Sequence, residues 1–217
     1  MGDFSGFTHV IFDLDGVLLD TEPFYTRATQ EVVAPFGKTF GWSVKAQLMG
    51  RDALTSARTL VAALELPISA EEYLARKEPL LCAMFPEATE MPGAARLVQS
   101  LRARGLKLAV ATSSSARHFR LKTGRHAWFD AFDVVVCGDH PGVKQLKPAP
   151  DIFLVAREAL GAAPETCLVI EDSLAGVAAA LAAGMQVLAL AAPELAESAF
   201  NGARRVVRSY AELDLAP

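Results

Sequence analysis

A short apolar segment that ends in two acidic residues constrains the fold of this chain more than any other feature. Residues 10–12 are Val-Ile-Phe, and Asp13, Leu14, Asp15 and Gly16 follow directly. A continuous apolar run is typical of a strand buried in a parallel sheet, and charge fits such a strand only at its end, where open α/β sheets bind ligands. Gly16 lets the chain turn sharply after the second acid. The segment therefore predicts a buried strand with a functional site at its carboxyl end.

Beyond residue 90, predicted strands alternate with predicted helices. We expect helices over 94–104, 116–125, 151–160 and 173–183, and strands over 106–111, 132–136, 167–170 and 187–190, with a last edge strand at 205–207. This alternation implies right-handed crossovers between parallel strands. The expected fold class is therefore α/β, with a doubly wound, Rossmann-like parallel sheet.

The segment between the first strand and residue 90 contains helical patterns and no predicted strand. Helices are expected over 26–34, 53–64 and 70–85, and the last of these has Ser69 as its N-cap. Proline and glycine residues separate the helices. We therefore expect an all-helical cap domain over residues 19–88, inserted into an α/β core formed by residues 1–18 and 89–217.

The composition is that of a compact protein without a broad nucleic-acid surface. The chain has 217 residues, of which 52% are hydrophobic and 21% charged, and its net charge is −4. Cys82, Cys137 and Cys167 lie in apolar surroundings, so we expect buried free thiols. No basic flank of a signal peptide precedes the first strand. These features predict a reducing, cytoplasmic compartment.

An uncharged stretch at residues 174–193 is long enough to span a bilayer. It is rich in alanine, and Gly184 and Gln186 interrupt it. A helix up to Ala183, a turn at Gly184 and a strand from Gln186 explain this stretch better. We therefore expect no membrane span.

Polar residues follow four of the predicted strands. They are Asp13 with Asp15, residues 112–115 (Thr-Ser-Ser-Ser), Lys147 in a long loop, and Glu171 with Asp172. Each group has an inert interpretation when it is taken alone: the acids could cap a turn, the hydroxyls could cap a helix, and Lys147, like nearby Lys144, could be solvated. Because the carboxyl ends of parallel strands meet at one edge of the sheet, their shared position predicts a single pocket instead.

The residue types in this pocket suit phosphoryl transfer. Asp13 can attack phosphorus as a nucleophile, and Asp15 can protonate a leaving alcohol and later deprotonate water. Lys147 supplies a positive charge for the transferring phosphoryl group and for Asp13. The expected phosphate- and substrate-binding residues are Thr112, Ser113 and Ser114, whose following amides open a helix, with Gly16, Glu22 and Arg51.

The same acids predict a metal site. Two carboxylates as close as those of Asp13 and Asp15 resist joint ionisation unless a cation or a shared proton relieves them. Mg²⁺ is a hard cation that prefers oxygen ligands. The expected ligands are Asp13, Asp172 and a main-chain carbonyl at Asp15, while Glu171 is either a direct ligand or a support for the other ligands.

Four motifs resemble those of the haloacid dehalogenase-like superfamily, in its phosphatase and phosphomutase branch. Residues 12–22 (Phe-Asp-Leu-Asp-Gly-Val-Leu-Leu-Asp-Thr-Glu) resemble the first motif, 111–114 the second, 147–153 the third and 171–176 the fourth. With the helical cap, the resemblance spans nearly the whole chain. It implies Mg²⁺ and a phosphoaspartate intermediate at Asp13, and the presence of Asp15 argues against dehalogenase activity.

Within that branch, the chain resembles the β-phosphoglucomutases and the pseudouridine 5′-phosphatases. The mutases have a Lys-Asn pair where this chain has Ser115-Ala116, and a histidine where it has Tyr25. These departures favour a phosphatase over a mutase. Substrate choice in this architecture comes from the cap, where Glu22, Arg51 and the residues around Leu48 and Met49 are candidates for contacts with the leaving group.

Two rival interpretations belong to other classes of function. The basic helix at 116–125 could bind nucleic acid, but we interpret its charged residues as a solvated face, because no aromatic platform accompanies them; they are Arg117, His118, Arg120, Lys122, Arg125 and the adjacent His126. A catalytically silent scaffold would be expected to have lost its nucleophile. We therefore expect a monomeric, Mg²⁺-dependent phosphatase that acts on a small phosphorylated metabolite, without a nucleic-acid or membrane partner.

Overall fold

The computed structural model describes residues 2–48 and 53–215 and divides the chain into two compact units. The sheet unit comprises residues 1–20 and 89–217, and the helical unit comprises residues 21–88. The chain enters the helical unit two residues later than we expected, after residue 20 and not after residue 18. Two short strands, β2 (Leu19–Asp20) and β3 (Thr89–Glu90), pair antiparallel and so join the two ends of the sheet unit.

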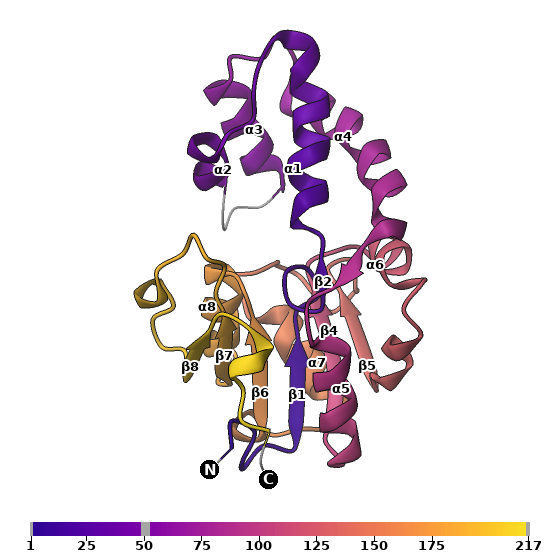
Figure 1. Ribbon diagram of the computed structural model, residues 1–217, viewed down its shortest axis with the longest axis vertical. Coiled ribbons are helices and arrows are strands. Elements are labelled where there is room, and N and C mark those ends of the chain that lie inside the picture. Colours follow the sequence, from indigo (N-terminus) through magenta and orange to yellow (C-terminus); the bar gives the residue numbers. More distant parts are fainter. Residues whose placement is uncertain (1, 49–52, 216–217) are drawn as a thin grey trace. The chain divides into compact units, whose positions relative to one another are not determined.

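Six strands form one parallel sheet, as the alternation of strands and helices predicts (Figure 1). Their order is β5-β4-β1-β6-β7-β8, and every neighbouring pair is parallel. Because β1 lies between β4 and β6, the crevice where the strand order reverses opens beside its carboxyl end. The strands are β1 (His9–Phe12), β4 (Lys107–Thr112), β5 (Val134–Cys137), β6 (Cys167–Glu171), β7 (Gln186–Leu190) and β8 (Arg205–Val207).

Helices cover both faces of this sheet, which confirms the doubly wound architecture. On one face, Ile11, Ala109 and Val169 pack with Ile152 and Phe153 of α7 and with residues of α8. The alternate strand residues face the opposite side, where α5 lies in front of the sheet while α7 lies behind it (Figure 1). The helices of the sheet unit are α5 (Ala94–Ala103), α6 (Ala116–Thr123), α7 (Asp151–Leu160) and α8 (Leu174–Ala182).

The uncharged stretch at 174–193 folds as expected, because it contains one whole helix, α8, and one strand, β7. Helix α8 ends at Ala182, Gly184 adopts φ +77°, and β7 begins at Gln186. Within the described residues, no helix is both long and apolar enough to cross a membrane. The three cysteines form no disulfide, and burial raises the pKa of the Cys137 thiol to about 11.

The helical unit has a hydrophobic core of its own, to which Val33, Leu60 and Tyr73 belong. Ser69 caps α4, because its side chain accepts a hydrogen bond from the Glu72 amide. The first helix begins earlier than predicted, at Glu22, and the second was not predicted. The helices are α1 (Glu22–Val33), α2 (Trp42–Leu48), α3 (Ala53–Ala63) and α4 (Ala70–Met84). Short 3-10 helices complete the chain at Ala34–Phe36, Phe85–Glu87, Ala127–Ala131, Pro164–Thr166, Glu197–Ala199 and Tyr210–Glu212.

Candidate active site

Three neighbouring strands bring the predicted polar residues to one edge of the sheet. Asp13 lies directly after β1, and its amide donates to the Ile170 carbonyl of β6 at 3.0 Å. Thr112 and Glu171 are the last residues of β4 and β6, the strands on either side of β1. The three side chains are buried. The apolar strands thus end together in a cluster of buried polar groups.

Lys147 joins this cluster from the loop that precedes α7. Its ammonium group donates to Asp13 Oδ1, to Glu171 Oε1 at 2.6 Å and to the Ala111 carbonyl at 3.0 Å, and it lies 4.9 Å from the centre of the Phe153 ring. Burial by itself would lower the pKa of Lys147, but the carboxylates of Asp13 and Glu171 raise it above its ordinary value. Lys147 is therefore a fixed cation between two buried carboxylates.

Asp15 and Asp172 also lie in this cluster, so its carboxyl groups outnumber the positive charge of Lys147. Burial raises the pKa of Asp13, against the opposing effect of Lys147, and both Glu171 and Asp15 raise it further. Burial also raises the pKa of Asp172 well above its ordinary value, with contributions from Glu171 and Asp13. Carboxylates that share a buried site in this way are stabilised in their ionised form by a bound cation. The donor set therefore fits a hard divalent metal ion.

Gly16 holds one of these acids in place through a close backbone contact. Its φ is +81°, and a Cβ atom at this position would lie 2.2 Å from Asp172 Oδ2. The Asp172 carboxylate therefore packs against the turn that follows Asp15, and only glycine fits there. We expected Gly16 among the substrate-binding residues, whereas the structure gives it a contact with a candidate metal ligand.

Glu171 uses both of its carboxylate oxygens in contacts with protein donors. Oε1 accepts from Lys147, and Oε2 accepts from the amide and the hydroxyl of Ser173, both at 2.9 Å. A Cβ atom at Gly176 would lie 1.8 Å from Oε1, so the first turn of α8 closes over this carboxylate. Of the two alternatives left by the sequence, this geometry favours a support for Lys147 over a direct metal ligand.

The hydroxyl-rich segment after β4 differs in part from the phosphate cradle that we expected. Thr112 Oγ1 accepts from the Ser114 amide at 3.1 Å, and Ser115 caps α6 by accepting from the His118 amide. The Ala116 amide donates to Asp139 at 2.9 Å. These amides are already engaged within the protein. Ser113, by contrast, is exposed at the strand end.

The prediction that all the charged residues of the basic helix form a solvated face was wrong for Lys122. Arg117 and Arg120 are exposed, but Lys122 is only 1% exposed. Its Nζ donates to Asp15 Oδ1 at 2.5 Å and to Ser114 Oγ at 2.8 Å. Phe119, three residues earlier, shares a helical face with Lys122, but the basic residues around both hide this pattern in the sequence.

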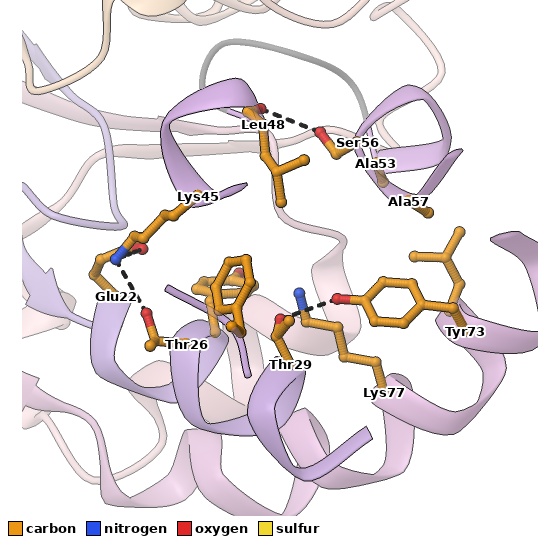
Figure 2. A pocket seen from close by; sticks show the side chains of 13 residues that line it. Glu22, Thr26, Thr29, Lys45, Leu48, Ala53, Ser56, Ala57, Tyr73 and Lys77 are labelled. Atoms are coloured by element: carbon orange, nitrogen blue, oxygen red, sulfur yellow. Dashed lines mark hydrogen bonds and ion pairs between the residues drawn. The ribbon is translucent and has the colours of Figure 1, made fainter. Parts of the chain in front are cut away.

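A cavity of about 410 Å³ lies among the helices of the helical unit (Figure 2). Glu22 and Leu48, which we expected to contact the leaving group, both line it. Arg51 and Met49, the other cap residues of that prediction, lie outside the described residues. Tyr25, the departure from the mutase pattern, also lines the cavity.

Two lysines place charge in a cavity whose lining is otherwise mostly apolar. Lys45 Nζ forms an ion pair with Glu22 Oε1 at 2.7 Å and donates a hydrogen bond to Thr26 Oγ1 at 3.0 Å (Figure 2). Burial lowers the pKa of Lys77 to about 8, although Glu22 opposes the shift, and its Nζ lies 5.5 and 5.6 Å from the ring centres of Tyr25 and Tyr73. The cavity therefore combines a hydrophobic wall with a few charged groups.

Comparison with known proteins places the chain in a family. Residues 7–184 match the family model of haloacid dehalogenase-like hydrolases. The chain is 44% identical to (DL)-glycerol-3-phosphatase 1, mitochondrial, of Arabidopsis thaliana over 97% of this chain and 72% of that protein. It is 43% identical to a protein named probable pseudouridine-5′-phosphatase in Drosophila melanogaster over 94% of this chain and 90% of that one.

A solved structure of similar fold also resembles the chain in sequence. It is that of a Thermotoga maritima protein provisionally named β-phosphoglucomutase, with a TM-score of 0.76 and 34% identity, over 92% of this chain and 93% of that one. The family model covers most of the chain, and both sequence relatives extend over nearly all of it. The chain therefore belongs to the haloacid dehalogenase-like hydrolases.

Proposed function

We propose that this protein hydrolyses a small phosphomonoester through an aspartyl-phosphate formed at Asp13. The observation that carries the proposal is the contact of Lys147 with both Asp13 and Glu171 at the carboxyl end of β1. A buried carboxylate beside a fixed ammonium group is prepared to attack phosphorus while the charge of the phosphoryl oxygens is stabilised. The names of the relatives, which are phosphatases of glycerol phosphate and of a nucleoside phosphate, support the same reaction class.

The reaction consists of two displacements at phosphorus. In the first, an Asp13 oxygen bonds to phosphorus, the bond to the ester oxygen breaks, and Asp15 gives a proton to the leaving alcohol. In the second, Asp15 takes a proton from water, the water oxygen bonds to phosphorus, and the bond to Asp13 breaks. Phosphate leaves, and both carboxyl groups return to their starting state. Lys147 stays beside Asp13 throughout.

Mg²⁺ is the proposed cofactor, and its ligands are drawn from the cluster described above. The carboxylates of Asp13 and Asp172 and the main-chain carbonyl of Asp15 would hold it, while Glu171 holds Lys147 in position. When bound, Mg²⁺ supplies positive charge to the phosphoryl oxygens. Thr112 and Ser113 are the proposed phosphate contacts at the end of β4.

Gly16→Ala tests this assignment of the metal site. The new Cβ atom would meet Asp172 Oδ2, so the carboxylate must move by about an ångström, and a displaced ligand is expected to weaken Mg²⁺ binding about 10-fold or more. The measurement is a Mg²⁺ titration of phosphatase activity. Gly105→Ala is the matched control, since Gly105 has the similar φ of +82° with no atom within 4 Å. Equal losses of thermal stability in the two variants, with unchanged Mg²⁺ dependence, would contradict the assignment.

The leaving group is proposed to be a small polyol or nucleoside that is recognised by the helical unit. The cavity that the ion pair of Glu22 and Lys45 and the side chain of Lys77 help to line offers charged partners for the hydroxyls of such an alcohol, and its mostly apolar wall would pack against the carbon skeleton. We keep Arg51 in this proposal on the basis of its sequence position alone. The partner is therefore a small phosphorylated metabolite, while the monomeric state and the cytoplasmic location stay predictions.

A sugar phosphomutase is the second candidate, because a structural neighbour has that provisional name. A mutase must hold a second phosphate, yet Ser115, which stands where the mutases have lysine, caps α6 with its side chain. Tyr25 stands where the mutases have histidine, and it lines the cavity of the helical unit. Both positions favour the phosphatase.

Phosphate release from a panel of esters, with and without Mg²⁺, tests the proposed function. The panel contains glycerol 3-phosphate, pseudouridine 5′-phosphate, hexose 6-phosphates and β-glucose 1-phosphate, and glucose 6-phosphate formation is followed in parallel. We expect Mg²⁺-dependent release that EDTA abolishes. Isomerisation of β-glucose 1-phosphate without release would favour the mutase, and a folded protein that turns over no ester would contradict both candidates.

A further inference from the structure

Lys122 occupies an unusual place for a lysine, because its entire side chain is buried in the sheet unit. It follows two turns after the start of α6, and its Nζ meets Asp15 Oδ1 at 2.5 Å and Ser114 Oγ at 2.8 Å. Ser114 Oγ in turn donates to Asp15 Oδ2 at 2.9 Å. The three side chains close a ring in which lysine donates twice, serine accepts and donates, and aspartate accepts with both oxygens.

Such a ring is costly to bury, so its presence calls for a physical reason. Removing an ammonium group from water is unfavourable, and a partner offsets that cost only with good geometry and further hydrogen bonds. A lysine that serves only solubility would remain exposed, as Arg117 and Arg120 do on the same helix. The two partners of Lys122 in the ring come from the candidate active site: Asp15 lies in the loop after β1, and Ser114 lies in the loop after β4.

We propose that Lys122 is a positioning residue for Asp15, and that with Ser114 it fixes the orientation of this carboxylate for proton transfer. This inference rests on the proposed function, because it assumes that Asp15 serves the alcohol in one step and water in the next. A carboxyl group held by both oxygens cannot rotate freely, so it presents the same edge to the leaving oxygen, when it is protonated, and to the attacking water, when it is ionised. A misplacement of about 1 Å in such a group can cost about 100-fold in rate.

The two buried lysines of the site therefore have separate tasks. Lys147 contacts Asp13 and Glu171, and Lys122 contacts Asp15 and Ser114. Loss of Lys122 should therefore impair the steps that need Asp15 while leaving the attack of Asp13 nearly intact. The two roles can be measured separately, because esters differ in whether their leaving groups must be protonated as they depart.

The test compares Lys122→Met with the wild type on two esters at saturating Mg²⁺. Glycerol 3-phosphate has an alkoxide leaving group that must be protonated, whereas p-nitrophenyl phosphate releases a stable nitrophenolate without a proton. For glycerol 3-phosphate we expect kcat/KM to fall about 100-fold, within the range attributed to general acid-base catalysis. For p-nitrophenyl phosphate we expect kcat/KM to fall less than about 5-fold.

The second step provides an independent readout on p-nitrophenyl phosphate. Because water attack also needs Asp15, kcat should fall about 100-fold and KM should fall with it. Rapid mixing should then show a burst of about one nitrophenolate per enzyme molecule, followed by slow turnover. A variant that is merely partly unfolded would lower the burst and both values of kcat/KM in parallel, so the burst amplitude separates positioning from loss of structure.

Two further variants and the wild type complete the experiment. Arg120→Met removes the same charge from the exposed side of α6 and should behave as wild type on both esters. Ser114→Ala should show the pattern of Lys122→Met with a smaller amplitude, since Lys122 would still hold one Asp15 oxygen. Equal losses on the two esters, or no loss in Lys122→Met, would overturn the inference. A wild-type protein that is inactive on every ester would instead refute the proposed function.

Discussion

Asp13→Asn is expected to abolish phosphatase turnover, with a loss of at least about 10⁴-fold in kcat. An amide nitrogen or oxygen cannot form the aspartyl-phosphate, and the amide side chain also removes a negative charge from the candidate metal site. The substitution is nearly isosteric, and it relieves a carboxyl group whose pKa burial raises. We therefore expect thermal stability to be unchanged or slightly increased. Phosphate release from the ester that the wild type prefers is the measurement.

The control for this prediction is Asp15→Asn, which should leave the nucleophile in place. That variant should still accept a phosphoryl group from p-nitrophenyl phosphate, and denatured samples should then carry covalently bound phosphate. The Asp13→Asn protein should carry none. Substantial turnover by Asp13→Asn, in a preparation free of wild-type enzyme, would rule out the covalent mechanism altogether.

Lys147→Met is expected to have the second large effect, on both activity and stability. Methionine has a similar length but no charge, so Asp13 and Glu171 would lose the cation that lies between them. Breaking a buried ion pair by removing one partner costs about 3–5 kcal/mol of unfolding free energy. The loss of a charge that stabilises the phosphoryl oxygens should lower kcat by about 10²–10³-fold or more. Denaturant unfolding and phosphate release measure the two effects.

Lys144→Met is the matched control, because Lys144 lies in the same loop and carries the same charge. Lys144 is exposed, and its ammonium group donates only to the Pro141 carbonyl among the contacts described for it. We expect this variant to keep the stability and the activity of the wild type. If Lys144→Met lost activity and stability while Lys147→Met kept both, the assignment of Lys147 to the active site would be wrong.

The general architecture could be predicted because its determinants are local in the sequence. The apolar run before Asp13 and the alternation of strands with helices determine a parallel sheet, and parallel strands bring their carboxyl ends to one edge. That is enough to bring Asp13, Lys147 and Glu171 together. The two-residue strands β2 and β3 could not be predicted, because two residues are too few for any periodic pattern.

The contacts within the site depend on packing, which sequence patterns describe poorly. Lys122 lies on a short helix with basic residues around it, and the pattern does not reveal that one of them turns inward to Asp15. Gly16 and Gly176 could be predicted as turn and helix residues, but not as the surfaces against which Asp172 and Glu171 pack. Such close approaches arise from distant segments and become visible only in three dimensions.

The central position of β1 also affects how the protein is made. This strand is synthesised before both of its sheet neighbours, which begin at Lys107 and Cys167. The intervening helical unit can bury its own core before either neighbour exists. Long-range parallel pairing is slow, and unpaired apolar strands are prone to aggregate. The segment that leads to Asp13 must therefore be shielded on the ribosome until its sheet neighbours have been made.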